Sequence, residues 1–391
     1  MRILLLFLLV PSILATAPDL HAQQEESDLR IFGYFQSSFQ HWTKESGIPD
    51  GFQTDRAKNF FTAQQLNLFL QKDLAKNWRS FVNFEALNNL STGKQWGSYS
   101  LEEAWARYRY DERFNLKLGL QIPIFNHLNE IKNRTPLLPY VIRPLVYEAS
   151  FDEFIAVRQF TPTHAFVQAY GFLSAGATKL DYAVYLGNSP NINGSPGLGP
   201  TGVDTSATVM VGGRVGLRHK ELKLGISGTF DKTNILQGLQ SFASVGGGKD
   251  RFREINRYRL GGDLSYHISG LSLESEFIVL RYDDGVSGVS IDGEFIYGTL
   301  GYSLKDMWYL YGGYWFLEED DLLTDAASPG QIFGALGKSG VINGGFSFSP
   351  NERVTFKGQL ARVDFTRVVP AINLKFHSHF YHISTAVSVF F

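Results

Sequence analysis

Apolar residues recur at every second position in segments spread along most of the chain. In the stretch FNLKLGLQI, five large apolar residues from Phe114 to Ile122 share one face, and polar residues or glycine alternate with them. A period of two is the signature of a β-strand with one apolar face, whereas a helix repeats every 3.6 residues. The alternation continues to the last residue, Phe391, so the C-terminus is predicted to lie in a sheet.

Sixteen segments of this kind are predicted. They cover residues 31–42, 60–74, 77–87, 99–110, 114–122, 164–175, 178–188, 207–218, 221–231, 255–268, 271–283, 292–303, 307–317, 339–348, 352–363 and 377–391. Most have about ten residues or a little more, which is the length that a tilted strand needs to cross a bilayer.

The connections between these segments alternate strictly in length. The short ones, such as Ala75-Lys76, Gly176-Ala177 and Ser269-Gly270, all follow even-numbered segments, and the connections after odd-numbered segments are longer. Outer-membrane barrels have short turns at the periplasmic end and long loops outside. The sequence therefore predicts an all-β fold, a transmembrane antiparallel β-barrel of about sixteen strands. A soluble sandwich, the alternative, has no reason to place every long loop at one end.

The first 22 residues have the pattern of a secretory signal peptide. Arg2 precedes an apolar run of about a dozen residues, and Ala22 is a small residue suited to the cleavage site. An N-terminal anchor helix is the alternative, which the shortness of the run disfavours. The predicted organisation is a signal peptide, 1–22, and a single barrel domain, 23–391, in the bacterial outer membrane.

The composition argues against several other classes of protein. The chain has no cysteine, so no disulfide framework holds it together, and its net charge of −2 gives no reason to expect nucleic acid as a partner. No cofactor is predicted. No metal is predicted either, because His377 and His379 lie two apart on one strand without a third ligand near them in the sequence.

Most charged residues fall on the strand face opposite the apolar one. Seven basic residues are predicted to line the pore, namely Arg107, Arg109, Arg214, Arg218, Arg257, Arg259 and Lys357. An Arg or Lys on the lipid face costs about 2–4 kcal/mol at the midplane. The exceptions, Arg281 and Arg362, fall near the outer ends of their segments, where that cost is small. Such a wall predicts a wet lumen with a weak anion preference, and an interior plugged by paired charges is the alternative.

The third long connection, residues 123–163, is rich in Leu, Ile, Val, Phe and Tyr and contains five prolines. Apolar content of this kind needs a surface to pack against, and loops this long are usually functional or disordered. The loop is therefore predicted to fold into the barrel and to constrict the pore, with a folded external cap as the alternative. Its charged candidates for the constriction are Glu130, Lys132, Arg134, Arg143 and Glu148.

Several stretches resemble the phosphate-selective porin O/P family, among them NLKLGLQIPIFN, LDYAVYLGNSPN, GGRVGLRH and SLESEFIVLRYDD. Gly119 to Phe125 resembles the family's Gly-x-x-x-Pro-x-x turn into its constriction loop, and Arg214 resembles its arginine in a later strand. The resemblance implies a 16-stranded, often trimeric porin that passes small anions or other small solutes. The family's dense lysine ladder is absent here, because inward-facing arginine is commoner and acids are interspersed.

The leading hypothesis is a non-enzymatic porin, a passive diffusion channel for small hydrophilic solutes. Its expected partners are outer-membrane lipid or lipopolysaccharide, small solutes or anions, and further copies of itself in a homotrimer. The first alternative is an outer-membrane barrel enzyme, a lipase or protease, for which His41 and His127 are the loose candidates. The second is a structural surface barrel that does not conduct.

Overall fold

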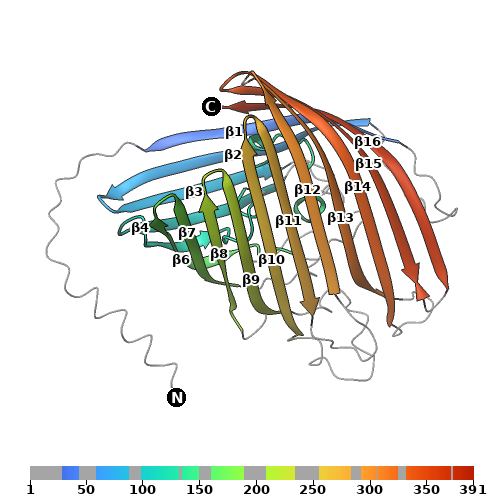
Figure 1. Cartoon of the computed structure of the whole chain (residues 1–391), viewed down its shortest axis with the longest axis horizontal. Helices are drawn as coiled ribbons and strands as arrows, with labels where there is room; N and C mark the ends of the chain where they lie inside the picture. The colour runs from blue at the N-terminus through green and yellow to red at the C-terminus, as the bar shows by residue number, and fades with distance from the viewer. Residues whose placement is uncertain are drawn as a thin grey trace.

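The computed structural model describes residues 29–43, 59–87, 98–131, 134–148, 160–188, 208–233, 255–282, 292–305, 307–324, 332–370 and 373–391. These residues form a closed antiparallel barrel of sixteen strands (Figure 1). The predicted signal peptide, 1–22, lies outside the described residues. No helix among the described residues is long and apolar enough to cross a membrane.

The strands follow one another around the barrel in chain order, and β1 pairs with β16. They are β1 (Arg30–Trp42), β2 (Asn59–Ala75), β3 (Trp78–Leu87), β4 (Ser98–Arg109), β5 (Asn115–Gln121), β6 (Ala165–Ala175), β7 (Thr178–Gly187), β8 (Met210–His219), β9 (Leu222–Thr233), β10 (Ile255–Ile268), β11 (Leu271–Tyr282), β12 (Asp292–Leu304), β13 (Trp308–Thr324), β14 (Ile332–Asn351), β15 (Val354–Val369) and β16 (Leu374–Phe390). Two short 3-10 helices, η2 (Thr135–Leu137) and η3 (Leu145–Tyr147), lie between β5 and β6.

Each of the sixteen predicted segments corresponds to one strand, so the predicted fold class is confirmed. The largest differences lie in β13, β14 and β15, which run six or seven residues beyond the predicted ends. Their extensions pair with one another, as Thr324 does with Ile332, and Val369 pairs with Leu374 of β16. Backbone pairing continues here beyond the residues that alternate in polarity. The strand ends predicted from the alternation are therefore too short.

The last strand closes the barrel against the first. Tyr34 is the register partner of Phe390, and the backbones of Gly33 and Phe391 exchange two hydrogen bonds of 2.9 and 3.0 Å. Each strand therefore has two neighbours, and the sheet has no open edge. In hydrocarbon this closure is required, because an unpaired peptide group there has no water to bind. The prediction that the C-terminal residues lie in a sheet is confirmed.

The two faces of the barrel wall differ in polarity. Ile226, Leu260 and Ile342 on the outer face are 58–66% exposed, whereas Gln36 and Ser388 on the inner face are fully buried. A soluble protein has the opposite arrangement. An apolar exterior and a polar interior suit a barrel that has lipid around it.

Strand β5 ends in a bulge that leads into the third long connection. Gly119 has a φ of +114°, and the pairing of β5 with β6 shifts register between Leu118 and Gln121. A Cβ atom at Gly119 would lie 2.9 Å from the Cα atom of Trp105. Only glycine adopts this backbone conformation without strain. The glycine therefore ends the regular pairing at the point where the chain leaves the wall.

We expect Gly119→Ala to lower the free energy of unfolding by about 1–3 kcal/mol, because the added methyl group meets backbone in a strained conformation. Urea unfolding of the protein in lipid vesicles, followed by tryptophan fluorescence, measures this change. The matched control is Gly298→Ala in β12, where nothing lies within 4 Å of the new Cβ atom. Equal destabilisation by both substitutions would contradict the role given to Gly119.

Candidate functional site

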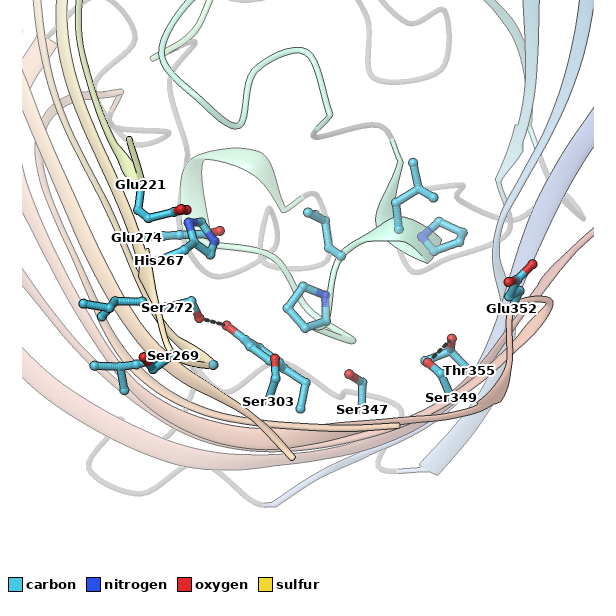
Figure 2. Close-up of a pocket in the computed structure, with 18 of the residues that line it drawn as sticks. Glu221, His267, Ser269, Ser272, Glu274, Ser303, Ser347, Ser349, Glu352 and Thr355 are labelled. Atoms are coloured by element: carbon cyan, nitrogen blue, oxygen red, sulfur yellow. Dashed lines mark hydrogen bonds between the residues drawn. The ribbon is translucent and has the colours of Figure 1, made fainter. Parts of the chain in front are cut away.

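The described part of the connection between β5 and β6, residues 122–131, 134–148 and 160–164, lies inside the barrel. Phe125, Ile142 and Leu145 are fully buried in one apolar cluster with Phe295 and Trp315 from the inner face of the wall. Figure 2 shows this connection inside the curve of the strands. For its described residues, the prediction that the loop folds inward is confirmed. The apolar residues of β11 to β16 and of β1 provide the surface on which they pack.

Glu276 of β11 holds two parts of the loop. Its carboxylate accepts hydrogen bonds from the backbone N–H groups of His127 (2.8 Å) and Leu128 (2.6 Å) and from the hydroxyl of Tyr147 (2.6 Å). Burial of Tyr147 beside this carboxylate raises the pKa of its hydroxyl well above the ordinary value, so the hydroxyl stays protonated and donates. One wall side chain therefore fixes two separate parts of the loop.

Gln359 of β15 holds the middle of the loop. Its Oε1 atom accepts from the backbone N–H groups of Val141 (2.9 Å) and Ile142 (2.7 Å), and its Nε2 atom donates to the carbonyl of Ile142 (3.3 Å). Gln64 of β2 donates to the carbonyl of Val141 at 2.8 Å. Because β2, β11 and β15 all bind it, the loop is anchored at several places around the lumen.

Three of the seven predicted pore-lining residues are buried in contacts rather than open to a lumen. Lys357 is 2% exposed and donates to the carbonyl of Thr135 at 3.0 Å. Arg257 and Arg259 are 1% and 3% exposed and both bind Asp231, at 2.7 and 3.1 Å. The expectation that these three form part of an open basic wall is wrong. Each is buried, and a buried charge requires a partner that neutralises or solvates it, so their charges are directed at Asp231 or at loop carbonyls.

Arg214 and Arg218 share one acid on the inner wall. Arg214 binds Asp181 (2.6 Å) and Asp263 (2.7 Å), and its side chain is only 10% exposed. Arg218 binds the other oxygen of Asp181 at 2.8 Å and remains 52% exposed. Arg214 therefore ties β7, β8 and β10 together, and Arg218 keeps most of its guanidinium in contact with solvent.

Three cationic side chains stand directly opposite one another across β3, β4 and β5. Arg79 is the register partner of Arg107, and Arg107 is the partner of Lys117. Arg79 also binds Asp73 at 2.5 Å, and the Lys117 ammonium lies 4.7 Å from the ring centre of Trp105. Like charges directly opposite one another destabilise a sheet. The row therefore concentrates positive charge at one place on the wall.

A second row of three cations crosses β7, β8 and β9. Lys179 is the register partner of Arg218, and Arg218 is the partner of Lys223. The alternation in each strand already placed Lys117 and Lys179 on the inward face, but neither was predicted as a pore residue. Only the pairing of strands shows that these residues meet cations across the sheet. The remaining predicted wall residue, Arg109, is exposed at the end of β4 and belongs to neither row.

The predicted loop charges are mostly paired. Arg134 binds Glu103 of β4 at 3.2 Å, and Arg143 binds the buried Glu148 at 3.3 Å. The partner of Glu148 therefore comes from the loop itself and not from the barrel wall. Glu130 is partly exposed. Lys132 lies outside the described residues, as do residues 149–159 of the loop.

A cavity of about 960 Å³ lies between the loop and the wall, at the end of the barrel where the short turns lie. Figure 2 shows hydroxyl groups along this wall, and those of Ser272, Ser303, Ser347, Ser349 and Thr355 belong to the lining. Glu221, His267 and Glu274 lie together at one side of it. A lining of this kind offers hydrogen bonds to water and small hydrophilic molecules.

The closed barrel, its apolar exterior and its inward loop define a porin-type outer-membrane barrel. No protein-family profile matches the chain, and no curated protein matches it significantly in sequence.

The similarity to solved structures lies in the fold. The anion-selective porin from Comamonas acidovorans matches with a TM-score of 0.57 at 13% identity, over 94% of this chain and all of that one. OmpF of Salmonella typhi, in complex with daunomycin, matches with a TM-score of 0.56 at 11% identity, over 93% of this chain and 98% of that one. A loop-deletion mutant of OmpT, an outer membrane protein of Vibrio cholerae, matches with a TM-score of 0.56 at 10% identity, over 94% of this chain and all of that one. At these identities the matches establish the barrel fold.

We expect Glu276→Ala to loosen the loop, because it leaves two backbone N–H groups and one hydroxyl without their acceptor. Unpaired buried donors cost about 1–3 kcal/mol each, so cleavage by chymotrypsin after Tyr147 should be at least about tenfold faster than in the unsubstituted protein. Mass spectrometry identifies the cut. Glu352→Ala, in the exposed turn before β15, is the control and should leave the rate unchanged. Unchanged cleavage in Glu276→Ala would show that Glu276 does not hold the loop.

Proposed function

We propose that this protein is a passive diffusion channel of the bacterial outer membrane, a porin for small hydrophilic solutes with a weak preference for anions. The observation that carries the proposal is the pair of cation rows on the inner wall, Arg79–Arg107–Lys117 and Lys179–Arg218–Lys223. Rings or walls of one charge set the selectivity of aqueous pores.

The placement of the rows favours this function over a purely structural one. Neighbouring cations at about 4 Å repel by about 1 kcal/mol in water and by more in a low-dielectric wall. This repulsion opposes folding, and an anion in the lumen relieves it. The loop packs its apolar residues on β1 and on β11 to β16, on another part of the wall from the rows. The side of the lumen that carries β3 to β9 is therefore the proposed path.

The acids near the rows explain why the preference is weak. Asp73 binds Arg79, and Asp181 binds both Arg214 and Arg218. These carboxylates offset part of the positive charge. Phosphate-like anions are the proposed preferred solutes, supported by the resemblance to the phosphate-selective porin O/P family, and the hydroxyl-lined cavity would admit neutral hydrophilic solutes as well.

The enzyme alternative has less support. His41 on β1 binds Asn59 at 2.7 Å, on a face of the strand opposite to buried Gln40 and Trp42. His127 belongs to the loop inside the barrel. The two candidates therefore lie on different sides of the wall and do not form one group. Hydrolysis of lipid or peptide that His41→Ala or His127→Ala abolishes would favour an enzyme.

The proposed assembly is a homotrimer whose outer surface contacts lipid and lipopolysaccharide. Its support is the apolar exterior and the resemblance to an often trimeric family. Cross-linking in mild detergent, followed by electrophoresis without heating, would reveal three copies, and a single copy would argue against a trimer.

We expect the channel to be more permeable to chloride than to potassium in a planar bilayer under a salt gradient. The double substitution Arg107→Gln with Lys117→Gln should lower the permeability ratio by at least about twofold, because it removes two neighbouring charges from the wall. Lys72→Gln on the outward face of β2 removes one charge from the other side of the wall and should have no effect.

Two outcomes would contradict the proposal. Clear cation preference in the unsubstituted channel would overturn the role of the cation rows while leaving a channel. Absence of conductance from folded, inserted protein would favour the structural surface barrel.

A further inference from the structure

The hairpin of β15 and β16 carries a cluster of polar side chains on its outward face. Even-numbered residues of β15 and odd-numbered residues of β16 point outward, as the exposure of Leu360 (53%) and Ile383 (45%) shows. Val363 and Phe380, which point inward, are 0% and 1% exposed. Asp364 is therefore on the outward face together with the histidines of the HSHFYH stretch.

Strand register brings a third ligand to the two histidines. Asp364 is the direct cross-strand partner of His379, and His377 lies two residues before His379 on the same face. Asp364, His377 and His379 each offer one ligand atom within 4.8 Å of the other two. The Nε2 atom of His377 lies 3.8 Å from the Oδ1 atom of Asp364.

These distances suit a small divalent ion after a modest adjustment. With bonds of about 2.05 Å, a tetrahedral zinc ion holds its ligand atoms about 3.3 Å apart. No gap in the cluster therefore has to close by more than about 1.5 Å, shared between two side chains. The side chains of Asp364 and His377 are 30% and 57% exposed, so they have room to turn.

A neighbouring hydroxyl orients one of the histidines. The Nδ1 atom of His377 lies 3.0 Å from the Oγ1 atom of Thr366. When Nδ1–H donates to Thr366, the lone pair of Nε2 faces Asp364. Metal-binding histidines commonly have their second nitrogen held in this way.

Arg362 competes for the same carboxylate. Its Nε and Nη2 atoms each donate to Asp364 at 2.9 Å. A carboxylate has about four acceptor sites, so an ion and a guanidinium can share it, although their charges repel. Lys375 is exposed two residues before His377, and Lys338, which binds Glu318, is the register partner of Thr366. These cations limit the affinity of the site.

We propose that Asp364, His377 and His379 form a binding site for a divalent transition-metal ion of the zinc type on the outward rim of the barrel. Two imidazoles favour such an ion over calcium or magnesium, which prefer oxygen ligands. The remaining coordination positions face the exterior and take water. The site does not depend on conduction through the lumen.

The test is titration of the full-length refolded protein in detergent with Zn²⁺, after chelator treatment, by isothermal titration calorimetry. We expect one Zn²⁺ per chain. His377→Ala, His379→Ala and Asp364→Asn should each weaken binding by at least about tenfold, and Arg362→Gln should strengthen it because a competing cation is removed. His219→Ala is the matched control, because His219 also bonds a threonine, Thr178, but lies at a short turn.

A spectroscopic measurement separates coordination from indirect effects. Cu²⁺ bound to the unsubstituted protein should show hyperfine coupling to imidazole nitrogen in electron paramagnetic resonance, and the double variant His377→Ala with His379→Ala should lose it. The shift in electrophoretic mobility on heating verifies that each variant is folded. Zn²⁺ binding that is absent, or that is equal in the double variant and the unsubstituted protein, would overturn the proposal.

Discussion

Hydrogen bonding between β1 and β16 is the interaction on which the rest of the structure depends. A peptide group in hydrocarbon finds no water, so each strand needs a partner on both sides. The first and the last strand are each other's missing partner. Tyr34 pairs with Phe390, and two hydrogen bonds join Gly33 to Phe391. Once the sheet is closed, one face meets lipid and the other encloses a space. The apolar outer face that the strands share follows from this.

The lumen wall has two chemically different parts, and the loop after β5 packs on one of them. Its apolar residues pack on one part of the wall, and Glu276 and Gln359 satisfy backbone groups that the loop would otherwise bury unpaired. This is the usual requirement for burying a segment without regular secondary structure. Another part of the wall, β3 to β9, carries the two cation rows. The apolar packing of the loop and the cation rows therefore occupy different parts of the lumen wall.

The sequence predicted the strands and the inward loop because both depend on patterns within one segment. A period of two is visible in any strand, and the apolar content of residues 123–163 requires a packing surface. Contacts between segments depend on register, which no single segment records. Three contacts could therefore not be predicted from the sequence. They are the buried ion pair of Arg257 with Asp231, the hydrogen bonds from Lys357 to loop carbonyls, and the position of Asp364 beside two histidines. The extended ends of β13 to β15 were missed because pairing there does not require an apolar face.

Closure of the barrel is tested most directly by a disulfide between β1 and β16. The chain has no cysteine, so two introduced ones would be the only thiols. Ser38 and Ala386 are register partners at a position without direct backbone hydrogen bonds, where Cα atoms lie about 4.5 Å apart, within disulfide range. Ser38→Cys with Ala386→Cys should form an intramolecular disulfide in the folded protein, and Ser38→Cys with Ser384→Cys should form it far less. Equal cross-linking of both pairs, or none in the first, would contradict a barrel closed in this register.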